Sequence, residues 1–150
     1  MILVIQRVKQ SSVKIKDEIA GRIGTGLLVL IGIEGTDGNE DLDWLVKKLI
    51  NLRIFPDDNK ILNKSAMDLG AEILIISQFT LCASTKKGNR PSFLRAAPPE
   101  ISKPLYQEFI NKVRMESGLK VETGVFGADM EVSLVNDGPV TLILDTKNKI

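Results

Sequence analysis

The beginning of the chain alternates apolar and polar positions with a period of two. Within Met1–Lys9, the residues Leu3, Ile5 and Arg7 fall on one face of an extended chain, and the alternation continues through Ser11–Ile15. Successive side chains of a β-strand point to opposite faces, so this pattern is typical of a half-buried strand. We therefore expect β structure over most of this region.

Two later segments are rich in consecutive apolar residues and predict buried strands. These segments are Leu27–Ile33 and Ile73–Ile76, and such runs are typical of strands that are covered on both faces. Ile19–Ile23 predicts a shorter return strand, which Gly24-Thr25-Gly26 separates from the first buried strand. No helical pattern follows this Gly-x-Gly element, so we expect a turn there rather than a phosphate-binding loop.

Two segments have apolar residues at helical spacing. Asp41–Arg53 carries an apolar face, with acidic residues in its first turn and basic residues later, as the helix dipole favours. The second segment begins within Pro99–Ser102 and ends at Ser117, and Gly118 occupies the position where helices commonly stop. Asn63–Gly70 is compatible with either a loop or a single helical turn.

The end of the chain contains three strand-like segments and a dense turn signal. The segments are Lys120–Thr123, Met130–Val135 and Val140–Leu144, and Asn136-Asp137-Gly138-Pro139 separates the last two. Each of these four residues favours a turn for a different reason. One interpretation is a plain hairpin turn. The other is a turn that presents backbone carbonyls to a ligand, and spacing alone leaves both open.

The order of the predicted elements indicates the fold class. Strands outnumber helices and do not alternate regularly with them, which favours an α+β fold with a mostly antiparallel or mixed sheet and two main helices. The chain has 150 residues, enough to bury a proper core. With neither an internal repeat nor a linker in the sequence, we expect a single compact domain over residues 1–150.

Composition changes the picture mainly through what is missing. The sequence contains no histidine and one cysteine, Cys82, which excludes Ser-His-Asp and Cys-His catalysis within one chain and a structural zinc site. We expect neither a metal nor another cofactor. Apolar residues make up 43% of the chain and the net charge is +1, so any nucleic-acid contact needs a local patch. A single cysteine favours the cytoplasm, and a start without a basic leader argues against a signal peptide. The longest apolar runs are too short to cross a membrane.

Polar residues follow directly after the second buried strand, in Ser77-Gln78-Phe79-Thr80-Leu81. Burying such groups is costly unless each finds a partner. They either bond to neighbouring backbone, which is the common outcome, or form a site where the strand ends.

A basic loop comes next and carries Lys86, Lys87, Arg90 and Arg95, with Phe93 between the last two cations. Such a loop either remains solvated or follows a phosphate backbone and stacks a base. We treat these four cations as candidate residues for binding a nucleic acid.

Three motifs taken together resemble the D-aminoacyl-tRNA deacylase family. They are Ser77-Gln78-Phe79-Thr80-Leu81, Gly88-Asn89-Arg90-Pro91-Ser92-Phe93 and Asn136-Asp137-Gly138-Pro139-Val140-Thr141. The opening Gln6-Arg7-Val8 and the run Leu27–Ile33 are similar to the family as well, so the resemblance covers essentially the whole chain.

The resemblance implies a cytoplasmic homodimer built on a β-barrel-like domain. It implies hydrolysis of the ester that joins a D-amino acid to tRNA, and removal of glycine mischarged onto tRNA. In this family the Gly-Pro bond is cis and reaches into the pocket of the other subunit, where its carbonyls leave no room for an L side chain. The resemblance assigns this substrate-binding role to Gly138 and Pro139, with Asn136 in the same motif and Arg7 as the residue that braces it.

For the chemical step, the resemblance assigns the catalytic motif to Ser77, Gln78, Phe79 and Thr80. It implies that the 2′-hydroxyl of the terminal tRNA adenosine assists the attacking water, and the N–H groups around Phe79 and Thr80 are our candidates for the oxyanion contact. A rival role makes Thr80 a covalent nucleophile, although the sequence supplies no obvious base for it.

Two alternatives remain at this stage. A related family removes L-alanine from tRNA and uses a trans Gly-Pro bond, but its version of the strand motif differs from the one present here. A non-catalytic RNA-binding module would use the basic loop to hold tRNA and would carry out no chemistry.

Overall fold

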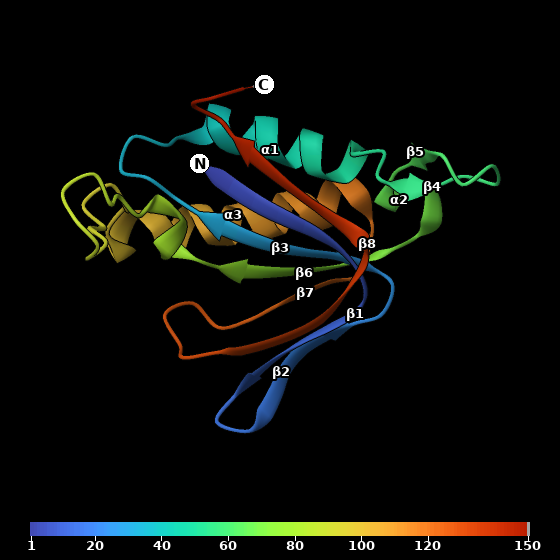
Figure 1. Cartoon of the computed structure of the whole chain (residues 1–150), viewed down its shortest axis with the longest axis horizontal. Helices are drawn as coiled ribbons and strands as arrows, with labels where there is room; N and C mark the ends of the chain where they lie inside the picture. Colours follow the sequence, from blue (N-terminus) through green and yellow to red (C-terminus); the bar gives the residue numbers. More distant parts are fainter. Residues whose placement is uncertain (150) are drawn as a thin grey trace.

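A mixed sheet of six strands forms the body of the molecule (Figure 1). The structure is a computed structural model and describes residues 1–149. The strands are β1 (Ile2–Ile15), β2 (Glu18–Ile23), β3 (Gly26–Gly32), β6 (Glu72–Ser77), β7 (Val121–Thr123) and β8 (Glu131–Asp145). Their order is β2-β1-β3-β6-β7, and β8 pairs with β1. The α+β class and the mixed sheet predicted from the sequence are confirmed.

The long strand β1 joins most of the sheet together. One edge of β1 pairs antiparallel with β3 through its first half and with β2 through its second half. The other edge pairs antiparallel with β8 along nearly its whole length. By contrast, β3, β6 and β7 run parallel to one another. The carboxyl ends of these three parallel strands therefore meet at one edge of the sheet.

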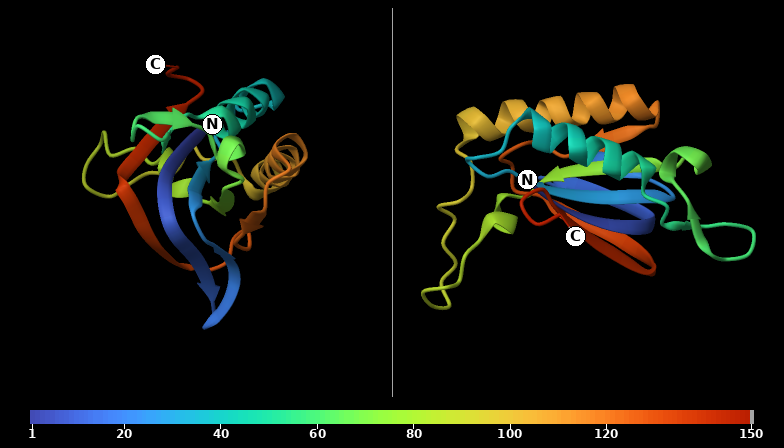
Figure 2. Two further views of the ribbon diagram at one scale, coloured as in Figure 1. Left: turned by 90° about the vertical axis from the view of Figure 1, so that its right-hand side faces the viewer. Right: turned by 90° about the horizontal axis from the view of Figure 1, so that it is seen from above.

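The sheet curls until β2 and β7, the strands at the two ends of the strand order, nearly meet (Figure 2). Gly21 of β2 lies so close to β7 that an added Cβ would stand 2.8 Å from the carbonyl oxygen of Thr123. Nearby, Lys120 Nζ donates a hydrogen bond to the Arg22 carbonyl at 3.2 Å. These contacts make the sheet barrel-like, as expected.

Two long helices cover one face of the sheet (Figures 1 and 2). They are α1 (Asn39–Asn51) and α3 (Pro99–Ser117), and an ion pair between Lys112 and Asp43 joins them. Their buried side chains, such as Leu45 and Phe109, pack against apolar residues of β1, β3 and β6. A second apolar cluster, which includes Val13 and Leu74, fills the inside of the curled sheet. Both faces of the central strands are thus buried, which explains their continuous apolar runs.

The remaining elements are short. They are β4 (Phe55–Pro56), β5 (Leu62–Lys64), α2 (Ala66–Leu69) and the 3₁₀ turn η1 (Phe79–Cys82). The pair β4–β5 is an addition to the predicted elements. The ambiguous segment Asn63–Gly70 contains the end of β5 and one helical turn, which Ser65 caps through its hydroxyl. The predicted stop at Gly118 is confirmed, since this residue has a left-handed φ of 65°.

The hairpin interpretation of Asn136-Asp137-Gly138-Pro139 is wrong. β8 runs through this segment without reversing, and both of its halves pair with β1. The register moves from Val8–Asn136 to Gln6–Thr141, so the four residues from Asp137 to Val140 lie opposite Arg7 alone and form a large bulge. Asn136 spans the bulge, because its Oδ1 accepts a hydrogen bond from the Val140 N–H at 2.9 Å. The side chain thus replaces the ladder bonds that the bulge interrupts.

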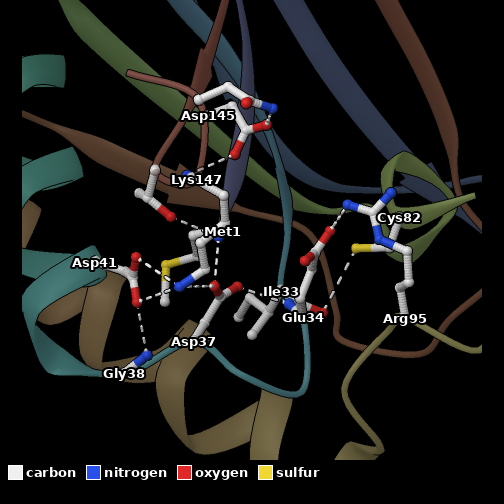
Figure 3. A network of polar contacts seen from close by, with 12 residues as sticks. Met1, Ile33, Glu34, Asp37, Gly38, Asp41, Cys82, Arg95, Asp145 and Lys147 are labelled. Atoms are coloured by element: carbon white, nitrogen blue, oxygen red, sulfur yellow. Dashed lines mark hydrogen bonds and ion pairs between the residues drawn. The ribbon is translucent and has the colours of Figure 1, made fainter.

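A buried polar network ties the start of β1 to the loop after β3 and to the end of β8 (Figure 3). The Met1 ammonium donates to Asp37 Oδ1 at 2.6 Å and to Thr146 Oγ1 at 2.8 Å. The Asp37 side chain is fully buried, and Lys147 Nζ lies 3.3 Å from its Oδ1. Charged groups tolerate such burial only when they are paired.

Candidate active site

A cavity of about 520 Å³ opens at the edge of the sheet where the three parallel strands end. Its lining comes from the ends of β3 and β6, the start of η1, residues 96–102 and the loop between β7 and β8. Ligands of sheets with parallel strands commonly bind beyond the carboxyl ends of those strands. The cavity is therefore the leading candidate for an active site.

The polar residues predicted at the exit of the buried strand lie at this cavity. Ser77, Gln78 and Phe79 line it, and Thr80 follows them in η1. The Gln78 N–H donates to the Ile31 carbonyl at 2.8 Å and fixes the exit of the strand against β3. The Gln78 side-chain amide donates to Thr80 Oγ1. An amide cannot take up the proton of a hydroxyl, so this contact does not activate Thr80 as a nucleophile.

The 3₁₀ turn leaves two backbone donors at its start. The first bond of the turn runs from the Leu81 N–H to the Gln78 carbonyl at 3.3 Å. The N–H groups of Phe79 and Thr80 come before this bond, and the first N–H groups of a helical turn have no partner within it. Both residues are exposed. Of the two residues, Phe79 lines the cavity and Thr80 does not.

The basic loop stands beside the same cavity. Ser84 and Ser92 pair as an isolated bridge, with N–H to carbonyl distances of 2.8 and 2.9 Å. They close a hairpin that projects away from the body of the molecule (Figure 2, right). Lys86, Lys87 and Arg90 are exposed on this hairpin.

Arg95 differs from the other three cations. It forms an ion pair with Glu34, whose side chain is 11% exposed (Figure 3). The structure therefore separates a hairpin with three cations from an arginine that is held against the body.

The Gly138-Pro139 segment is braced from two sides. The Arg7 side chain is 9% exposed, and its Nε donates to the Asp137 carbonyl at 3.0 Å. Its Nη1 donates to the Ile54 carbonyl at 2.6 Å. Gly138 has a φ of 136°, and an added Cβ would stand 2.9 Å from a Val140 methyl group. Only glycine adopts this conformation without strain.

Gly138 and Pro139 themselves are exposed, and the peptide bond between them is cis. With Arg7 and Asn136 they form one cluster. This cluster does not line the 520 Å³ cavity. Arg7 binds Ile54, which directly precedes β4, and β4 lies at the opposite end of the molecule from the carboxyl end of β6 (Figure 1). Within one chain, the two predicted halves of the site are therefore apart.

Several residues that line the cavity were not predicted from the sequence. Phe126, Gly127, Ala128, Asp129 and Met130 follow β7 and form one wall. A glycine-rich link between two strands was the visible signal. Parallel pairing of β7 with β6, which brings this loop to the cavity, depends on long-range contacts that the local pattern does not reveal.

Two ionisable side chains near the cavity, Cys82 and Tyr106, have raised pKa values and remain protonated at neutral pH. Burial raises the pKa of the Cys82 thiol, and the nearby Glu34 carboxylate acts in the same direction. Burial also raises the pKa of Tyr106 to about 12, and its hydroxyl donates to the Ile75 carbonyl at 3.0 Å. Neither group is prepared to act as a nucleophile or base at neutral pH.

Among residues 1–149, no group of three or more acidic or thiol side chains is arranged to hold a metal ion. In the same residues, no helix has both the length and the apolar character that a membrane span requires. The cavity itself is largely apolar, and the polar side chains that line it are the hydroxyls of Ser77 and Ser102, the amide of Gln78 and the carboxylate of Asp129.

Comparison with known proteins identifies the class of this barrel-like α+β chain. The model of the D-Tyr-tRNA(Tyr) deacylase family matches residues 4–145. A D-aminoacyl-tRNA deacylase of Flavobacterium psychrophilum is 58% identical over 149 residues, which is 99% of each chain. Another, from Bacteroides thetaiotaomicron, is 57% identical over the same share of both chains. The chain therefore belongs to the D-aminoacyl-tRNA deacylase family and is a hydrolase, which confirms the resemblance noted in its sequence.

Two solved structures share the fold. One, described as a c-Myc DNA unwinding element binding protein, has a TM-score of 0.92 and 42% identity, with 97% of this chain and 99% of that chain covered. The other, a probable eukaryotic D-amino acid tRNA deacylase, has a TM-score of 0.82 and 21% identity, with 95% and 97% covered. At that identity the second likeness concerns the fold alone.

Proposed function

We propose that this chain hydrolyses the ester bond of D-aminoacyl-tRNAs, and of glycyl-tRNA, to free amino acid and tRNA. Family membership supports the reaction, and the cavity at the end of β6 supports a site for the ester there. The observation that carries the proposal is that Ser77, Gln78 and Phe79 line this cavity. We place the protein in the cytoplasm, where charged tRNA is found.

We infer that the active protein is a homodimer in which each cavity receives Gly138 and Pro139 of the partner subunit. These two residues are exposed and do not line the cavity of their own chain. A twofold dimer places the same patch of each subunit on the other, so one contact would complete both sites. Leu134, Val135 and Ile143 leave apolar surface exposed along the same strand, with 36%, 44% and 65% exposure. Apolar surface of this kind favours association.

The selectivity of the proposed site comes from exclusion of the wrong enantiomer. A backbone segment fixed by Arg7 and Asn136 presents atoms whose positions do not depend on the substrate side chain. Such a wall blocks an L side chain by steric clash and leaves the D side chain pointing into free space. Glycine has no side chain to block, so it passes the same filter. This explains how one pocket would accept many D-amino acids.

The proposed chemistry requires little from side chains. An aminoacyl ester is already labile, so positioning and oxyanion stabilisation would supply much of the acceleration. The Phe79 and Thr80 N–H groups precede the first bond of η1 and are suited to the oxyanion. We propose that the 2′-hydroxyl of the terminal adenosine assists the attacking water. A substrate that brings its own hydroxyl accounts for catalysis by a chain without histidine.

The hairpin with three cations would hold the tRNA. Lys86, Lys87 and Arg90 are exposed and project from the body near the cavity. Phosphate contacts of this kind position a nucleic acid without reading its sequence. The net charge of +1 indicates that this contact is local.

Release of amino acid from matched D-tyrosyl- and L-tyrosyl-tRNA, with chelator present, tests the proposal. We expect fast loss of the D ester, with the L ester as stable as in buffer alone. Loss of both esters would contradict the proposed filter. Loss of neither, with tRNA still bound, would instead support an RNA-binding module without catalytic activity. Glycyl-tRNA is the matched third substrate and should be hydrolysed.

A further inference from the structure

Glu34 lies two residues after the end of β3, and its carboxylate contacts the segment that follows the basic hairpin. Its N–H donates to Asp37 Oδ2 at 2.7 Å, which links it to the buried network at Met1 (Figure 3). Its carboxylate pairs with Arg95 Nη2. The Glu34 carboxylate is therefore held by its own backbone and largely shielded from water, whereas the Arg95 side chain that pairs with it is 54% exposed.

Backbone bonds place the segment around Arg95 beside β3. The Gly35 N–H donates to the Arg95 carbonyl at 3.1 Å, and the Ala97 N–H donates to the Ile33 carbonyl at 2.9 Å. Ala97 is part of the cavity wall. These bonds hold the main chain on both sides of the Arg95 side chain. The ion pair with Glu34 adds a side-chain contact between the same segment and the body of the molecule.

Phe93 connects this segment to the cavity. Its ring meets the ring of Phe79 edge to face, with a centroid distance of 5.1 Å and an angle of 70°. Phe79 lines the cavity although its side chain is 55% exposed. A ring with so much free surface has few contacts that fix its position, and an aromatic pair of this geometry contributes directly to fixing it.

We propose that Glu34 and Arg95 form a clasp that holds Phe93 in place, and that Phe93 in turn positions the ring of Phe79. The inference rests on the proposed function, since it makes Glu34, Phe93 and Arg95 positioning residues for D-aminoacyl-tRNA hydrolysis. The clasp fixes the residue two places after Phe93, and Phe93 fixes the ring of Phe79 at the start of η1. A displacement of about 1 Å in a positioning group can cost about a hundredfold in rate. Arg95 therefore acts on the catalytic motif rather than on tRNA phosphate.

A double-mutant cycle separates these two roles of Arg95. We expect Glu34→Gln, Arg95→Ala and the double variant each to lower kcat on D-aminoacyl-tRNA about tenfold, with KM unchanged, because they break the same contact. Arg95→Lys should restore part of the rate. If Arg95→Ala raised KM while Glu34→Gln behaved like wild type, Arg95 would be a phosphate contact and the clasp would be refuted.

A spectroscopic measurement tests the clasp without any activity. The chain has five phenylalanines, so 4-fluorophenylalanine labelling gives a simple ¹⁹F spectrum in which Phe79→Leu identifies one signal. We expect Glu34→Gln, Arg95→Ala and Phe93→Leu to shift or broaden the Phe79 signal, whereas Leu94→Ala, at a neighbouring side chain that is 95% exposed, should not. An unchanged Phe79 signal in the folded variants overturns the inference. If the wild type proved inactive, this spectrum would still decide the clasp, so the two proposals fail separately.

Discussion

At the residue scale, the most informative side chain is Arg7. The alternating pattern placed it on the buried face of a strand, where a charged residue is costly unless every polar atom finds a partner. The structure supplies two carbonyl partners and an ion pair with Asp137 at 3.4 Å. Arg7 thus braces the bulge in β8, which is the role that the family resemblance assigns to it. Its contact with the Ile54 carbonyl was not predictable, because it depends on the fold.

Replacing Arg7 tests whether the bulge must be rigid. Lysine keeps the charge but cannot reach both carbonyls in the fixed geometry of a guanidinium group. We expect Arg7→Lys to reduce the ratio of D to L hydrolysis at least tenfold, and to lower the free energy of unfolding by about 1–3 kcal/mol through the unpaired Ile54 and Asp137 carbonyls. Deacylation assays and urea denaturation measure the two effects. An unchanged D to L ratio would show that the brace is structural only.

Asp41 permits a prediction about acid stability. Its side chain is 16% exposed. Burial acts to raise its pKa, but hydrogen bonds from Thr146, the Gly38 N–H and Lys147 outweigh it and lower the pKa from 3.8 to about 2. Since the folded pKa lies below the unfolded value, the stabilisation is complete above about pH 4 and is lost as the pH falls toward about 2.

We therefore expect Asp41→Asn to lower the free energy of unfolding by about 1–2 kcal/mol at pH 7. Thermal denaturation across the pH range measures the difference between the variant and the wild type. That difference should shrink between about pH 4 and about pH 2. A difference that stays constant with pH would contradict the assignment. Asp58→Asn is a matched control, because the Asp58 side chain is 99% exposed.

At the scale of elements, the local patterns predicted the long helices and strands and failed where distant contacts decide. The helix predicted at Asp41–Arg53 begins and ends two residues earlier, at Asn39 and Asn51. The turn signal at Asn136-Asp137-Gly138-Pro139 is compatible with a hairpin, because such residues usually reverse a chain. Here β1 continues past the bulge and pairs with both halves of β8, so the strand keeps its direction.

The candidate site was predictable only in part, because some of its residues are neighbours in sequence and others are brought together by distant contacts. Residues next to each other in sequence, such as Ser77, Gln78 and Phe79, could be identified as one site. The opposite wall, from Phe126 to Met130, reaches the cavity only through the parallel pairing of β7 with β6. Parallel strands are joined by long connections, so their neighbours cannot be read from a local pattern.

The hairpin closed by Ser84 and Ser92 allows a prediction about salt. If Lys86, Lys87 and Arg90 contact tRNA phosphates, replacing all three with alanine removes up to three counterion-releasing contacts. We expect KM to rise, and the slope of log KM against log salt concentration to fall by about 2. The rate at saturation should change little, since these residues lie outside the cavity lining. Equal salt slopes for variant and wild type would exclude the hairpin from tRNA binding.

At the scale of the whole molecule, the cavity and the Gly138-Pro139 segment lie apart in one chain. The sheet itself accounts for this separation. The cavity uses the carboxyl ends of parallel strands, whereas the bulge interrupts the antiparallel pair of β1 and β8 near Arg7. A second copy of the chain can bring the two together, and a twofold axis does so twice. Assembly would then be a condition for chirality selection.

Mixed dimers test this central claim most directly. One variant, Phe79→Ala, damages the cavity, and the other, Gly138→Val, introduces a side chain where φ is 136° and the neighbours leave no room. Each variant alone should be inactive on D-tyrosyl-tRNA. When the two are unfolded and refolded together in equal amounts, half of the dimers are mixed and each holds one intact site. We predict recovery of about a quarter of wild-type D-tyrosyl-tRNA hydrolysis, with L-tyrosyl-tRNA left intact, whereas a mixture as inactive as its components would show that each chain completes its own site.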